Sequence, residues 1–117
     1  MKISTRVLRE NTGWRLRMAR VAADFKTAVK LAEQLKIDQN SYSPYERGAS
    51  FPPPEVLGEI IKLTGVTAEW LLYGDARHLT VSAMDKLKEA DAELQRRIKS
   101  ESILRLRPTD PFESALN

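Results

Sequence analysis

The chain has 117 residues, 42% of them hydrophobic and 30% charged, a composition that indicates a globular protein and argues against a disordered one. It contains no cysteine, which excludes disulfides, thiolate nucleophiles and cysteine-ligated zinc sites. Its apolar runs are shorter than the roughly 18 residues that cross a bilayer, and it shows no secretory signal, so we expect a cytoplasmic protein with no membrane partner.

The net charge of +3 is unevenly distributed along the chain. Residues 1–36 carry nine Lys and Arg against three Asp and Glu, whereas residues 37–78 carry three against six. A basic N-terminal third is typical of a protein that binds a polyanion, and it is equally typical of a solvated basic helix face. Charge alone does not choose between these interpretations.

Residues 1–12 have no clear periodicity and are expected to form an N-terminal extension. The pattern becomes helical at Gly13, where small and apolar residues recur every three or four positions as far as Asp24. On this first predicted helix, Arg15 and Arg17 are expected to face mostly outward.

Two short helices are predicted next. Thr27 is typical of an N-cap and begins a helix from Ala28 to Leu35, and Asp38 begins another from Gln39 to Arg47. Only Lys36 and Ile37 separate them, which leaves room for a tight turn and nothing longer. Two helices joined in this way indicate a helix-turn-helix unit, whose second helix can lie in a groove of DNA.

The second helix of this unit has an inner and an outer side. Tyr42 and Tyr45 are expected to point back into the core, and the outward side chains are then those of Gln39, Asn40, Ser41 and Ser43. Pro44 lies inside the helix, where it removes a backbone donor and is expected to kink or tighten it, at a cost of about 3 kcal/mol in a regular helix.

Two more short helices complete a predicted five-helix bundle. Residues 52–54 are three prolines that force an extended linker, and the last of them suits the first position of a helix from Glu55 to Thr64. Thr67 then begins a helix from Ala68 to Tyr73. We therefore predict an all-α fold with one DNA-binding domain over residues 13–75.

A further helix is predicted within residues 80–106, beginning at Thr80 or Ser82, with Asp91 and Glu93 on its solvated side. Its apolar stripe consists of Ala83, Leu87, Ala90, Leu94 and Ile98. The stripe either holds two protomers together or folds back onto the bundle, and we favour the dimer contact. Residues 107–117 are expected to form a disordered tail.

Separated motifs within residues 13–75 carry a family resemblance. They are Arg15-Leu16, Arg20, Leu31-Ala32, Leu35, Tyr45-Glu46-Arg47-Gly48, Pro53, Val66, Trp70-Leu71-Leu72 and Gly74. In this order they resemble the Cro and repressor family of phage and bacterial regulators. The resemblance implies a repressor-like bundle and a homodimer that binds a palindromic operator in double-stranded DNA, with half-sites about 34 Å apart.

The resemblance also implies roles for individual residues. Gln39 and Asn40 occupy base-reading positions, and their amides can bond the N6/N7 edge of adenine, with Ser41 and Ser43 beside them. The residues implied to hold phosphates are Thr27, Lys30 and Arg47.

A structural pair is implied beneath this surface. Glu46 lies near a helix C-terminus, where the helix dipole disfavours a carboxylate, so a cationic partner is expected. The resemblance points to Arg20 as that partner.

The sequence departs from the family pattern at two further positions, and an alternative function remains open. Lys36 takes a turn position that is often glycine, where a left-handed conformation costs on the order of 1 kcal/mol. Ala28 replaces an amide and so removes a phosphate contact.

The alternative to a regulator is a protein-binding module, antitoxin-like or an accessory phage protein, whose DNA recognition has degenerated.

Catalytic function is the weakest interpretation. His78 is the one histidine, and it lies in a predicted linker with no triad or metal partner at helical spacing. We therefore expect no catalytic residues, no metal site, no cofactor and no small-molecule substrate.

Overall fold

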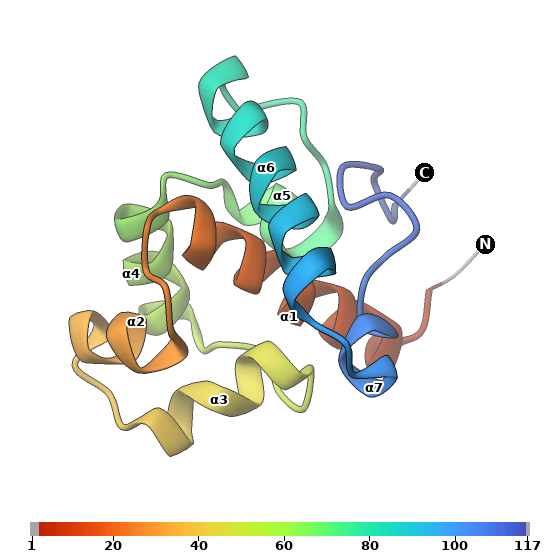
Figure 1. The fold of residues 1–117 in the computed structure, drawn as a ribbon. Helices are drawn as coiled ribbons and strands as arrows, with labels where there is room; N and C mark the ends of the chain where they lie inside the picture. Colours follow the sequence, from red (N-terminus) through yellow and green to blue (C-terminus); the bar gives the residue numbers. More distant parts are fainter. Residues whose placement is uncertain (1–2, 117) are drawn as a thin grey trace.

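The computed structural model describes residues 3–116, which form seven helices and no strand (Figure 1). The all-helical fold class is therefore as predicted. The helices are α1 (Thr5–Ala22), α2 (Ala28–Leu35), α3 (Gln39–Arg47), α4 (Pro54–Thr64), α5 (Ala68–Tyr73), α6 (Val81–Arg97) and α7 (Glu101–Leu104). No helix in this range is both long and apolar enough to span a membrane.

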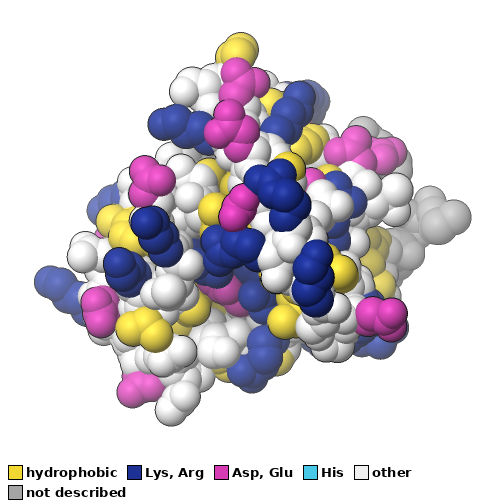
Figure 2. Space-filling model, viewed as in Figure 1, with side chains coloured by type: hydrophobic (Ala, Val, Ile, Leu, Met, Phe, Trp, Pro, Cys, Tyr) yellow, Lys and Arg dark blue, Asp and Glu magenta, His cyan; other side chains and the backbone are white. Residues whose placement is uncertain are grey.

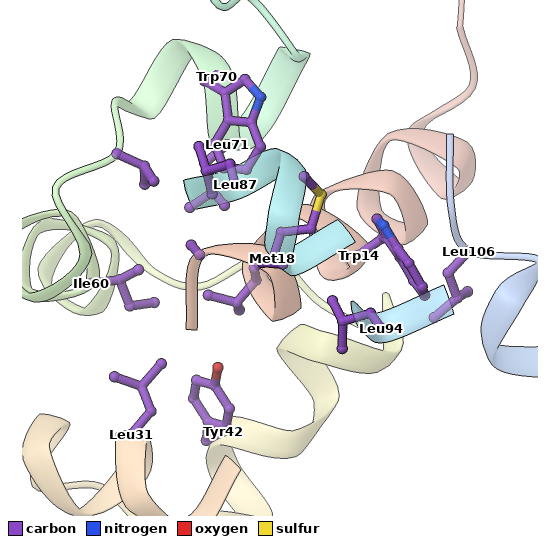
Figure 3. Close-up of a cluster of buried hydrophobic side chains, with 14 of the residues drawn as sticks. Trp14, Met18, Leu31, Tyr42, Ile60, Trp70, Leu71, Leu87, Leu94 and Leu106 are labelled. Carbon is purple, nitrogen blue, oxygen red and sulfur yellow. The ribbon is translucent and has the colours of Figure 1, made fainter. Parts of the chain in front are cut away.

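The central element is α1, which packs against α3, α5 and α6 (Figure 1). Figure 3 shows the core around it, in which Trp14 and Met18 of α1 lie in one cluster with side chains of α2 to α6 and with Leu106, which follows α7. The largest fully buried apolar side chains are Trp14, Trp70, Tyr42, Leu16, Met18, Leu31, Ile60, Leu71, Leu87 and Leu94. Because α1 lies against both α3 and α6, it sets the position of the helix-turn-helix unit relative to the C-terminal helix.

The prediction that residues 1–12 form an extension and that the first helix begins at Gly13 was wrong within the described range. The first helix begins at Thr5, where the Ser4 hydroxyl caps it by accepting a hydrogen bond from the Val7 amide at 3.1 Å. Its early turns are held by distant residues: Arg9 Nε donates to the Gly48 carbonyl at 3.2 Å. Such contacts leave no local periodicity in the sequence.

Helices α2, α3 and α5 have the predicted bounds because the signals that begin them, and those that end α3 and α5, are local. Thr27, Asp38 and Thr67 each accept a hydrogen bond from a backbone amide of the first helical turn. Gly48 and Gly74 end α3 and α5 in the left-handed conformation, which glycine adopts without strain. The signals that fix α2, α3 and α5 therefore lie within or beside each helix.

The C-terminal helix folds back onto its own chain, contrary to the favoured dimer contact. Leu87, Ala90 and Leu94 of α6 are buried, and α6 packs along α1. Asp91, which was predicted on the solvated side, is only 7% exposed and accepts a hydrogen bond from Trp14 Nε1 at 2.9 Å. The stripe is thus covered within one protomer.

The prediction of a disordered tail was also wrong for the described part of it. The Pro111 carbonyl accepts hydrogen bonds from Arg15 Nε at 3.1 Å and from Trp70 Nε1 at 3.0 Å. The Phe112 ring stacks on Trp70 with centroids 6.0 Å apart. Arg15 was expected to face outward, but its side chain turns inward to meet this tail, and the residue is only 2% exposed.

Candidate nucleic-acid interface

The helix-turn-helix unit is formed by α2, a turn over residues 36–38 in which Lys36 is left-handed, and α3. Lys36 takes φ 58° and ψ 39°, the conformation expected to cost on the order of 1 kcal/mol for a residue with a Cβ. The Ile37 amide donates to the Ala32 carbonyl at 3.1 Å and closes the turn. Asp38 then caps α3 by accepting from the Asn40 amide at 2.7 Å. This short connection fixes the angle at which α3 leaves α2.

The proline within α3 does not interrupt it. Gln39 to Arg47 remain α-helical on both sides of Pro44, although the Asn40 carbonyl has lost its usual amide donor. Tyr42 before the proline and Glu46 after it are both buried against the core. Tertiary contacts on each side of Pro44 therefore hold the helix together across the missing bond.

Most of the residues predicted to bind DNA are exposed. Gln39, Asn40 and Ser41 lie in the first turn of α3 and are open to solvent. Three more positions, Thr27, Lys30 and Arg47, are exposed as well, whereas Ser43 is half-buried.

Three of the predicted side chains already have hydrogen-bond partners. The Thr27 hydroxyl accepts from the Lys30 amide at 3.3 Å, and Arg47 Nη1 donates to Ser43 Oγ at 2.9 Å. The amide side chains of Gln39 and Asn40 have no hydrogen bond within residues 3–116, so they are available to a partner.

A buried polar cluster ties α3 to α1. Arg20 Nε donates to Glu46 Oε2 at 2.7 Å and Arg20 Nη2 to Oε1 at 3.3 Å, which is the predicted ion pair in bidentate form. Arg20 Nη1 also donates to the Phe25 carbonyl at 2.9 Å. Because the pair is buried, removing either partner would leave an uncompensated charge beneath α3.

Sequence reasoning missed two members of this cluster. The Tyr42 hydroxyl donates to Glu46 Oε2, and both burial and the neighbouring carboxylate raise the pKa of that hydroxyl. Arg17 Nη1 lies 3.6 Å from Glu46 Oε1. A signal for Arg17 was present, since it precedes Arg20 by three residues and side chains at that spacing share a helix face.

The backbones of α1 and α3 approach closely where Gly13 crosses α3. A Cβ at Gly13 would lie 2.5 Å from the Glu46 carbonyl oxygen and 2.9 Å from the Tyr45 carbonyl oxygen. A larger residue would force the helices apart and move the whole of α3. The close packing of α3 against α1 therefore fixes the position of the exposed first turn of α3.

Comparison with known proteins agrees with this geometry. Residues 6–71 match the model of a family described as a helix-turn-helix domain. No curated protein and no solved structure shows a significant match to the chain. The family match covers α1 to α4 and most of α5, more than half of the chain. The chain therefore belongs to the helix-turn-helix domain family, a family of DNA-binding domains.

Proposed function

We propose that this protein is a sequence-specific transcriptional regulator of the Cro and repressor type, of phage or prophage origin, which acts in the cytoplasm. Its partner is a palindromic operator in double-stranded DNA, bound by a homodimer. The observation that carries the proposal is the exposed first turn of α3, with free amides at Gln39 and Asn40, on a helix anchored to α1 by a buried ion pair.

Each exposed side chain takes a role suited to its chemistry. Gln39 and Asn40 read base edges, because a carboxamide can donate and accept at once to the N6/N7 edge of adenine. Ser41 and Ser43 lie beside them. Thr27, Lys30 and Arg47 contact phosphates, which set the position of the protein on the duplex without reading its sequence.

The test of base reading begins with sites selected from random DNA by the wild-type protein. Gln39→Ala should weaken discrimination at one base pair by about 1 to 3 kcal/mol and leave affinity for random DNA nearly unchanged. Gln34→Ala, which removes an exposed amide from α2, is the matched control and should change neither quantity. Equal losses on selected and random DNA for Gln39→Ala would remove Gln39 from its role.

The test of phosphate binding uses salt dependence. Arg47→Ala should weaken binding to all sequences alike and reduce the slope of log K against log salt by about 0.9, the value for one lost phosphate contact. Lys62→Ala on α4 removes a cation from an exposed position and serves as the control. A wild-type protein that binds no DNA even at low salt would favour the protein-binding module.

The homodimer makes a separate prediction about the selected sites. They should be palindromic, with half-sites about 34 Å apart, because two symmetry-related copies of α3 must enter successive turns of one groove. Light scattering on the complex should give two protomers for each site. Selected sites without symmetry, bound by one protomer, would contradict the dimer while leaving base reading by α3 intact.

A further inference from the structure

The cluster beneath α3 contains more positive than negative charge. Glu46 is its one carboxylate, and Arg20 and Tyr42 occupy that carboxylate at hydrogen-bond distance. Arg17 is the second guanidinium, and its closest approach to Glu46 is 3.6 Å, beyond a hydrogen bond. Its Nε is buried and has no acceptor within residues 3–116. The cluster thus has one cation more than its carboxylate can hold.

A largely buried guanidinium with one donor that lacks an acceptor is unfavourable to the free protein. Burial lowers the pKa of the Arg17 guanidinium, Glu46 opposes this shift, and Arg20 adds to it. The side chain nevertheless keeps 14% of its surface exposed, so an anion at the protein surface can reach it. An anion from solvent can therefore reach the Arg17 guanidinium and supply the acceptor that it lacks.

The position of Arg17 on α1 indicates at which part of the protein surface its side chain is exposed. Three residues earlier, Trp14 bonds to Asp91 of α6, and three residues later, Arg20 bonds to Glu46 of α3. Arg17 therefore lies on the part of α1 between its contacts with α6 and α3. Figure 2 shows Lys and Arg side chains gathered in the middle of this face, over the lower half of α6 and the region between α6 and α3. This surface adjoins the helix that we propose to enter the DNA groove.

We propose that Arg17 binds a phosphodiester of the DNA backbone when α3 lies in the groove. The inference rests on the proposed function and adds a contact outside the predicted DNA-binding set. A phosphodiester oxygen supplies the acceptor that the guanidinium lacks, and its charge balances the excess cation. Arg17 thus contributes to DNA affinity, while its charge lowers the stability of the free protein.

The test compares Arg17→Met with Lys62→Met, which removes an exposed cation from α4. For Arg17→Met we expect a thermal midpoint equal to or above that of the wild type. Affinity for selected and for random duplexes should fall by about tenfold or more, since a hydrogen bond to a charged group is lost. The slope of log K against log salt should shrink by about 0.9. Arg17→Lys should keep most of the slope, and Lys62→Met should change neither slope nor affinity.

Several outcomes would overturn the proposal. An unchanged affinity and slope for Arg17→Met would leave Arg17 with a structural role only, whereas a loss confined to selected sites would indicate base reading. If inorganic phosphate raised the thermal midpoint of the wild type but not of Arg17→Met, and DNA affinity were equal in both, the site would bind free phosphate. None of these results would contradict base reading by Gln39. If the wild type bound no duplex at all, both this proposal and the proposed function would be wrong.

Discussion

Two buried carboxylates lie on different sides of α1, and their surroundings differ in one respect. Glu46 fixes α3 to α1, and Asp91 fixes α6 to α1. Each accepts a hydrogen bond from an arginine and from an aromatic side chain, Tyr42 at Glu46 and Trp14 at Asp91. Glu46 is 3% exposed and Asp91 7%.

The difference lies in how completely each carboxylate balances its cations. Asp91 faces one guanidinium, Arg107, whose Nε and Nη2 donate at 3.0 and 2.7 Å, and Gln95 Nε2 completes the set at 3.0 Å. Glu46 faces two guanidinium groups and satisfies one of them by hydrogen bonding. The cluster at Asp91 is electrically balanced, whereas the cluster at Glu46 carries one excess positive charge that a further anion can balance. Two carboxylates with similar burial therefore differ in role: Asp91 serves packing of α6, and the surroundings of Glu46 can also bind an anion beside α3.

The largest effect on stability is expected from Glu46→Gln. It leaves both Arg20 and Arg17 without a charged partner beneath α3, so the free energy of unfolding should fall by about 3 to 5 kcal/mol. Urea unfolding followed by circular dichroism measures it. A loss below about 1 kcal/mol would mean that solvent reaches the cluster freely and would remove the contrast with Asp91.

A smaller loss is expected from Asp91→Asn, about 1.5 to 3 kcal/mol. Arg107 is still 26% exposed at its side chain and can be hydrated once the carboxylate is gone. Glu93→Gln removes a more exposed acid of the same helix and should cost at most about 1 kcal/mol. At temperatures where Asp91→Asn is folded, its DNA affinity should equal that of the wild type, and a specific loss of affinity would show that α6 supports α3.

The smallest effect is expected from Lys36→Gly, and it is a gain. Glycine relieves the left-handed strain at the α2–α3 turn, and the free energy of unfolding should rise by up to about 1 kcal/mol, measured as a higher thermal midpoint. Asp24 also has a positive φ, 67°, outside the turn, but Asp24→Gly should give a smaller gain, because aspartate tolerates the left-handed conformation better than lysine. If Lys36→Gly lowered the midpoint, the lysine side chain would have a stabilising contact that outweighs the strain.

The bundle was predictable where its signals are local. The hydroxyls and carboxylate of Thr27, Asp38 and Thr67 cap the helices that follow them, as their sequence positions indicate. The ion pair of Arg20 and Glu46 was predictable as well, through family resemblance and the electrostatics of a helix end.

The failed predictions concern contacts between segments far apart in the chain. The sequence around Arg15 indicates a solvated residue of an amphipathic helix. In the structure its Nε donates to the Pro111 carbonyl, 96 residues later. Asp91 reads as a surface acid until Trp14 and Arg107 converge on it. At the candidate site, the exposure of the α3 amides was foreseeable from helical spacing. The excess charge at Arg17 was not, because it depends on how side chains of α1 and α3 share a single carboxylate.

The two hydrogen bonds to the Pro111 carbonyl bear on how far this protein can be shortened from its C-terminal end. A fragment that keeps only residues 6–71 would contain Arg15 and Trp70 but not the oxygen that satisfies both of them. We therefore expect a fragment that ends at Leu71 to be less stable than one that extends to Phe112, about forty residues beyond the family boundary.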